Sequence, residues 1–127
     1  MQSLTISNAR NVVVEGVRSV SSELFHVVVL QSRGVTVRRV TVEAPADSPN
    51  TDGIHIHKST NVAVYDAAIR TGDDCVSVGP GNSNLWIERV ACGPGHGIRY
   101  VRPYGSMHGG NMIFFPINRV TNQLMIF

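Results

Sequence analysis

Short runs of β-branched residues recur along the chain, and no window shows a competing helical period. Val, Ile and Thr alternate at period two within each run, and Gly, Asn, Ser or Asp separates one run from the next. The pattern predicts an all-β protein made of short strands, centred on residues 12–14, 35–37, 40–42, 54–56, 62–64, 76–78 and 85–87.

Four of these runs return at nearly constant intervals. They begin at Asn11, Gly34, Asn61 and Asn84, which are 23, 27 and 23 residues apart, and a second short run follows each. A period in the twenties with two or three short strands per repeat is typical of a parallel β-helix. A leucine-rich solenoid would show a Leu-x-x-Leu-x-Leu frame, which is missing, and a β-sandwich would space its strands more loosely. We therefore predict a parallel β-helix of about four rungs.

Length and charge narrow the function classes. A chain of 127 residues is one domain by length, and 43% hydrophobic and 16% charged residues are typical of a globular protein. The net charge of +2, without a basic run or aromatic platform, does not favour nucleic acid, although a mild positive field would favour an anionic substrate. No run approaches the roughly 18 apolar residues of a membrane span. The first residues show no signal-peptide pattern.

Adjacent carboxylates are the main candidate for chemistry. Asp73 and Asp74 follow Gly72, and like charges this close repel unless they face water, bind a cation or share a proton at a working site. Asp52 and His96 also lie beside glycines, so we expect one cleft that contains all four side chains. Because neighbours on a regular strand point to opposite faces, Asp73 and Asp74 can serve one cleft only in a bend. The alternative is a solvated turn or a cation site.

Three segments identify a resemblance to a known family. SPNTDGIHI at 48–56, TGDDCVSVG at 71–79 and CGPGHGI at 92–98 resemble the three successive motifs of plant-type polygalacturonases. These enzymes hydrolyse the α-1,4-galacturonan of pectin on a right-handed parallel β-helix. The resemblance implies that the rungs occupy residues 1–98 and that 99–127 form a divergent tail, either capping or disordered. It also implies pectin or polygalacturonic acid as the partner.

The resemblance assigns roles to the three aspartates. Asp73 would be the general acid, while Asp52 and Asp74 hold and deprotonate a water, which inverts the anomeric centre. Negative charge from Asp52 and Asp74 would keep Asp73 protonated, and the three would titrate as a coupled set. No cofactor or metal is implied. A calcium-dependent pectate lyase-like eliminase on the same fold and a non-catalytic pectin-binding fragment are the alternatives.

Further site residues follow from the same motifs. His96 would be the active-site histidine, and Asn50 and His55 would contact the substrate. His55 and His57 share a strand face and their spacing suits a metal pair, but no third ligand is spaced to match. We therefore expect His57 to face solvent. Trp86 lies on a rung strand and is interpreted as a packed rung aromatic in preference to a sugar-stacking platform.

Cys75 and Cys92 are the only cysteines and lie 17 residues apart, slightly less than one rung. They could lie on stacked neighbours as two buried thiols or as a disulfide, and the resemblance implies the disulfide. A bond closing such a loop contributes roughly 3 kcal/mol in the loop-entropy model. It also implies an oxidising compartment, so we expect a protein secreted to the cell exterior or wall.

The chain departs from the family after Ile98. The family continues with Ser-Ile-Gly-Ser-Leu-Gly and an Arg-Ile-Lys motif that grips the substrate carboxylate, and neither follows here. We therefore expect a central fragment with impaired activity. Uncovered solenoid ends would favour self-association, although the apolar segment 112–117 could cover one of them.

Overall fold

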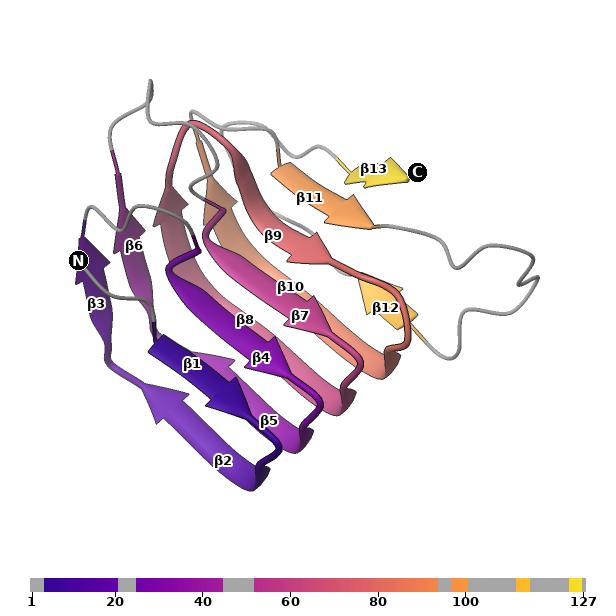
Figure 1. The fold of residues 1–127 in the computed structure, drawn as a ribbon. Helices are drawn as coiled ribbons and strands as arrows, with labels where there is room; N and C mark the ends of the chain where they lie inside the picture. The colour runs from indigo at the N-terminus through magenta and orange to yellow at the C-terminus, as the bar shows by residue number, and fades with distance from the viewer. Residues whose placement is uncertain are drawn as a thin grey trace.

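The computed structural model describes residues 4–20, 25–44, 52–93, 97–100, 112–114 and 124–126. Their strands wind into a parallel β-solenoid of about four turns, which confirms the predicted all-β parallel β-helix (Figure 1). Within these residues there is no helix long and apolar enough to cross a membrane.

Two sheets form most of the solenoid wall, and the strands described in them pair in parallel. The first sheet has six strands, in the order β1 (Leu4–Ser7), β4 (Val27–Leu30), β7 (Ile54–His57), β9 (Asp74–Val78), β11 (Gly97–Tyr100) and β13 (Leu124–Ile126).

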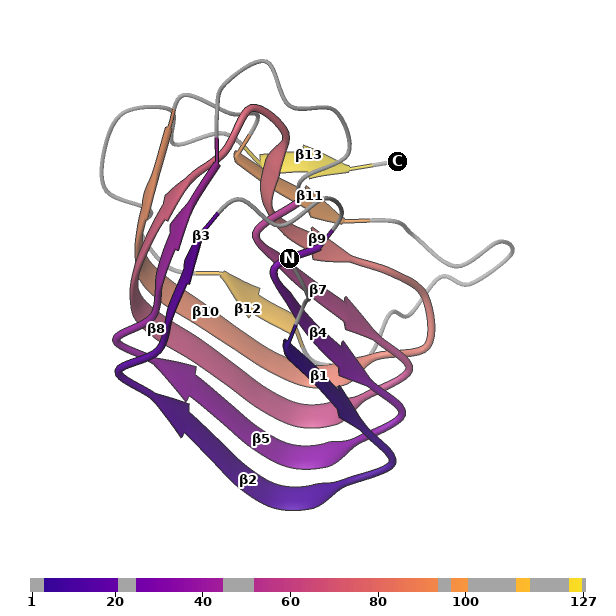
Figure 2. The same ribbon diagram turned by 60° about the vertical axis from the view of Figure 1, so that its left-hand side comes forward.

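The second sheet has seven strands. Its main path is β12 (Met112–Phe114), β10 (Ser83–Cys92), β8 (Thr60–Arg70), β5 (Arg33–Arg38) and β2 (Arg10–Glu15). Off this path, β3 (Arg18–Val20) pairs with β6 (Thr41–Glu43), which pairs with the end of β8. Figure 2 shows the long strands β8 and β10 bending from the side of the solenoid formed by β2 and β5 toward the side where β3 lies.

The register follows the repeat read from the sequence. Val12 pairs with Val35, Val35 with Val62, and Val62 with Leu85. The intervals of 23, 27 and 23 residues are therefore the lengths of successive turns. Strands stack because each rung presents the same alternation of side chains to the next.

The corners are made by residues with positive φ. Asn11, Asn61 and Asn84 have φ of 55°, 57° and 56°, a region that asparagine tolerates better than most residues. Gly34 takes this position in the second rung, where a Cβ would lie 2.9 Å from Oδ1 of Asn11. The Asn84 side-chain amide donates to Oδ1 of Asn61 at 3.0 Å. Stacked corners are thus tied to one another along the solenoid.

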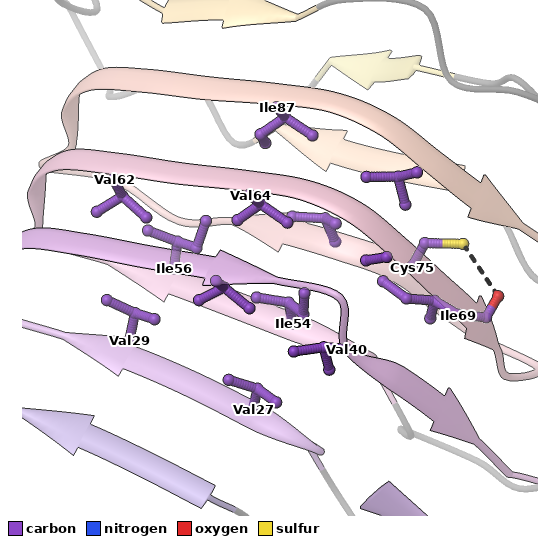
Figure 3. Packing of buried hydrophobic residues seen from close by; sticks show 14 of the residues in the cluster. Val27, Val29, Val40, Ile54, Ile56, Val62, Val64, Ile69, Cys75 and Ile87 are labelled. Atoms are coloured by element: carbon purple, nitrogen blue, oxygen red, sulfur yellow. Dashed lines mark hydrogen bonds between the residues drawn. The ribbon is translucent and has the colours of Figure 1, made fainter. Parts of the chain in front are cut away.

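The core lies between the sheets and is almost entirely Val and Ile (Figure 3). Val27, Val29, Ile54, Ile56 and Ile69 each have no exposed surface. Burying one such side chain contributes roughly 1.5–3 kcal/mol relative to leaving it in water. Inward side chains of the first sheet therefore fix which residues point outward on the same strands.

A ladder of buried polar side chains supports one corner. The hydroxyl of Ser32 accepts from Ala9 N at 3.2 Å, and that of Ser59 accepts from Ser32 N at 3.1 Å. In the next rung, Oδ1 of Asn82 accepts from Ser59 N at 2.8 Å, and its amide donates to two backbone carbonyls. The ladder satisfies amides that the turn leaves without strand partners.

Cys75 and Cys92 form a disulfide that joins β9 to the end of β10. Their Cα atoms are 5.9 Å apart, and both residues are buried. The predicted pairing is confirmed.

Trp86 corrects one interpretation of the sequence. Its neighbours Leu85 and Ile87 point into the core, so alternation along β10 directs Trp86 outward, where it is 36% exposed. The interpretation of Trp86 as packed within the rung is wrong.

Candidate active site

Three aspartates from two neighbouring strands meet at one end of the first sheet. Asp52 precedes β7, Asp73 lies in the bend before β9, and Asp74 is the first residue of β9. Because Ile54 pairs with Val76, Asp52 and Asp74 each lie two residues before a stacked pair. One oxygen of each carboxylate lies within 4.8 Å of the others. The bend brings Asp73 to the same side as its neighbour.

The bend before β9 is held by its own side chains. The buried hydroxyl of Thr71 donates to Asp73 O at 3.2 Å and accepts from Asp73 N at 3.3 Å. Asp74 N donates to Oδ1 of Asp73 at 2.8 Å, and Gly53 N donates to Asp74 O at 2.9 Å. The Asp73 carboxylate and the Asp74 main chain are therefore held by hydrogen bonds at the bend.

Gly53 allows the two rungs to approach at this point. A Cβ on Gly53 would lie 2.5 Å from the carbonyl oxygen of Cys75 and 2.5 Å from Cγ2 of Ile69. Any larger residue would separate β7 from β9 beside the carboxylates. Steric crowding therefore explains why a glycine follows Asp52.

Burial and neighbouring charge act together on the carboxylates. Asp74 is 1% exposed, while Asp52 and Asp73 are half-buried. Burial raises the pKa of Asp52 to about 6, the negative charges of Asp73 and Asp74 add to the shift, and a hydrogen bond from Ser77 opposes it. Nη1 of Arg99, on β11, lies 3.8 Å from Oδ2 of Asp74. The site therefore holds a proton among its carboxylates near pH 6.

Ser77 connects Asp52 to His55. Nδ1 of His55 lies 2.8 Å from the Ser77 hydroxyl, which also hydrogen-bonds the Asp52 carboxylate. Ser77 pairs with His55 in the β7–β9 register and is 6% exposed. Phe25 stacks on the His55 ring with centroids 4.6 Å apart. Burial lowers the pKa of His55, and the nearby His57 adds to that effect, so the ring is neutral at pH 7.

Sequence reasoning did not single out Ser77 or Phe25. The signal for Ser77 is its place between the inward-pointing Val76 and Val78, which directs it outward beside His55. Phe25 precedes β4, which pairs with β7 one rung later. Both are visible only after the chain is arranged in rungs.

His57 is half-buried and does not simply face solvent, so that expectation is wrong. Its ring centroid lies 6.0 Å from that of His55, and a Cβ on Gly79 would lie 2.5 Å from its Nδ1. Across the described part of the chain, three or more potential metal ligands come together only at the aspartate trio, so the two histidines have no third ligand beside them. Their rings are stacked along β7.

Two residues expected at the site, Asn50 and His96, lie outside the described residues.

The chain matches known proteins over most of its length. A family model described as glycosyl hydrolases family 28 matches residues 1–111, past Ile98 where the recognised motifs end. The chain is 53% identical to a polygalacturonase of Prunus persica over 95 residues, which are 75% of this chain and 24% of that protein. It is 48% identical to an exopolygalacturonase of Arabidopsis thaliana over 96 residues, 76% of this chain and 23% of the relative.

A polygalacturonase of Nicotiana tabacum is 45% identical over 108 residues, which are 85% of this chain and 26% of that protein. The chain thus spans about a quarter of the length of the curated relatives it matches.

Proposed function

The chain belongs to glycosyl hydrolases family 28, and from that premise we propose that it carries the carboxylate centre of an enzyme that hydrolyses α-1,4-galacturonosyl linkages in pectin. The observation that supports this most is the aspartate trio, in which one oxygen of each carboxylate lies within 4.8 Å of the others. The polygalacturonase names of the relatives support the substrate class.

Glycoside hydrolysis needs one carboxylic acid and one carboxylate. Asp73 is half-buried and can reach a bound sugar, which suits the general acid. Asp52 and Asp74 stack on neighbouring rungs and together can hold a water between two acceptors. The hydrogen bond between Asp52 and Asp73 provides a route for sharing the proton that the buried site retains.

The stereochemical outcome needs its own measurement. Inverting enzymes commonly place their carboxyl groups about 6.5–9.5 Å apart and retaining ones about 5–5.5 Å apart. The 4.8 Å of the trio joins one oxygen of each carboxylate, which is a different quantity from these separations of whole carboxyl groups. We propose inversion, because the full burial of Asp74 suits holding water better than direct attack on the sugar. NMR detection of the first-formed anomer tests this.

His55 has the features of a substrate contact. The neutral ring is fixed between Phe25 and Ser77, and it lies on β7, three residues after Asp52. A fixed neutral imidazole can hydrogen-bond a sugar hydroxyl without drawing the proton of the acid. Roles for Asn50 in binding and His96 in catalysis are proposed from the motif resemblance alone.

A calcium-dependent eliminase is the second candidate, because three close carboxylates also suit a divalent cation. Elimination would produce an unsaturated, ultraviolet-absorbing product and would stop when a chelator is added. Hydrolysis would produce neither result. An extracellular location is proposed because the disulfide requires an oxidising compartment.

The direct test measures reducing-end release from polygalacturonate by this chain and by Asp73→Asn. General acid catalysis contributes about 10²–10⁴-fold, so the variant should lose activity by that factor. The matched control is Asp66→Asn, because Asp66 is exposed, pairs with Arg89 and has a φ of 55° that Asn tolerates. Equal activity of Asp73→Asn and Asp66→Asn would remove Asp73 from the mechanism.

A further inference from the structure

A polar hollow of about 560 Å³ lies at the opposite end of the first sheet from the aspartate trio. Its lining residues belong to the corner where β1, β4 and β7 pass into β2, β5 and β8, and Figure 1 shows the course of these strands. Its side chains are three cations and several neutral hydrogen-bonding groups, including Arg10, Arg33, Lys58, Asn8, Gln31 and Thr60. No carboxylate is among its lining residues.

The charges at this corner are unusual for the solenoid. Arg10 pairs directly with Arg33 in the β2–β5 register, and like charges in directly opposed positions are destabilising. At the other end of the same two strands, Glu15 faces Arg38 and the two form an ion pair at 2.8 Å. β2 and β5 therefore place opposite charges together at one end and two positive charges together at the other.

Ion pairing across the described residues shows the same contrast. Five arginines have carboxylate partners: Arg18, Arg38, Arg39, Arg89 and Arg99. The remaining described cations make no ion pair; they are Arg70 and the three that line the hollow, Arg10, Arg33 and Lys58. Three of the four described cations without a carboxylate partner therefore line the hollow.

We propose that this hollow is a second subsite that binds the carboxylates of a galacturonan chain, apart from the aspartate trio. Neighbouring rungs are about 4.8 Å apart, so Arg10 and Arg33 present a row of guanidinium groups along the solenoid axis. Guanidinium binds carboxylate in a bidentate geometry, and the neutral amides and hydroxyl suit sugar hydroxyls. A polymer with one carboxylate on every sugar supplies the counter-charge that the stacked arginines lack.

The subsite is separate from the catalytic centre. Asp52 precedes β7 and Lys58 follows it, and six extended residues span about 20 Å. A galacturonan segment in the hollow would therefore leave the trio free and would hold the polymer on the solenoid. The ligand class rests on the proposed function, but binding can be measured without turnover.

The test titrates the full chain, carrying Asp73→Asn to prevent cleavage, with a galacturonate hexamer and follows backbone amide NMR shifts. The shifts should include residues 8–10 and 31–33, which lie at the hollow. Replacing Arg10 and Arg33 by Gln should weaken hexamer binding at these amides at least tenfold. The matched control replaces Arg18 and Arg89 by Gln, which removes the same charge from ion-paired sites and should change binding less than twofold.

Lys58→Gln provides a second variant, which should keep the fold. Lys58 has a φ of 50°, and Gln31 occupies the corresponding corner one rung earlier with a φ of 48°. It should also weaken binding at the hollow, by at least threefold. A fully methyl-esterified hexamer, which has no carboxylate charge, should not bind there.

Several results would overturn the proposal. Equal weakening by both arginine pairs would indicate a diffuse field, and shifts confined to residues near the trio would place all binding there. Binding of inorganic phosphate without binding of the hexamer would assign the hollow to another anion. If hexamer binding is confirmed while the chain lacks hydrolysis, the proposed function fails and the subsite stands.

Discussion

Replacing Asp52 by Asn should make the protein more stable at neutral pH while removing a carboxylate that the proposed chemistry needs. Asp52 is half-buried beside two other carboxylates, and burial with their charge raises its pKa from 3.8 to about 6. An amide has nearly the same shape and can still hydrogen-bond Ser77. The substitution therefore removes the charge with little change in packing.

The sign follows from proton binding in the two states. Because the folded state binds the Asp52 proton more tightly than the unfolded state, the free energy of unfolding falls as pH rises from about 4 to about 6 and is constant above that. A pKa raised from 3.8 to about 6 corresponds to almost 3 kcal/mol if the group is fully isolated from water. Since Asp52 is only partly buried, we discount this to about 1–2 kcal/mol.

Urea unfolding at pH 4 and at pH 7.5 measures the effect. Asp52→Asn should increase the free energy of unfolding by about 1–2 kcal/mol at pH 7.5 and change it by less than about 0.5 kcal/mol at pH 4. The control is Asp66→Asn, whose carboxylate has a pKa lowered by the Arg89 ion pair, so its loss should destabilise at pH 7.5. An Asp52→Asn protein that is less stable at pH 7.5, or equally stabilised at both pH values, would refute the reasoning.

Two further substitutions test the contacts around the trio. Ser77→Ala should raise the pKa of Asp52 further, because the hydroxyl favours the ionised form; carbon-13 NMR titration measures this, and Ser77→Thr should restore the value. Gly53→Ala should destabilise by about 1–3 kcal/mol in urea unfolding, because the new Cβ meets backbone. Gly79→Ala should cost less because its Cβ meets the His57 ring, which can rotate, and an equal cost would contradict the steric argument.

The fold could be predicted from the sequence because each rung repeats the same types of residue at the same positions. Stacked rungs bury Val and Ile at fixed intervals, so the spacing between Asn11, Gly34, Asn61 and Asn84 is also the strand register. Positive φ at these corners explains why Asn and Gly mark them. The disulfide between β9 and β10 followed from the resemblance and agrees with the register.

The details of the site were less accessible because its contacts join residues one rung apart. Ser77 is a common residue in an ordinary strand until its position beside His55 is known. His57 was expected in solvent because strand alternation predicts a face but not what else covers it, and Gly79 lets its ring lie close to the next rung. Trp86 was misplaced because a large aromatic residue was assumed to pack inside, whereas its parity with Leu85 directs it outward.

Like charges occur in stacked positions at two places in the described solenoid, and their repulsion is stronger at the largely buried aspartates than at the exposed arginines. Asp52 and Asp74 precede a stacked pair of β7 and β9, and Arg10 faces Arg33 in β2 and β5. Elsewhere the stack brings Glu15 to Arg38, so compensation is available to this fold. Stacked like charges at only these two positions are expected where a ligand or a shared proton supplies the missing counter-charge. The acidic pair can retain a proton, because burial raises the pKa of Asp52 to about 6. Arginines keep their charge at any working pH, so only an anion from outside can neutralise the pair of Arg10 and Arg33. Under the proposed function one polyuronate substrate would meet both conditions, since its glycosidic oxygen would accept a proton from the acidic site and its carboxylates would neutralise the basic one.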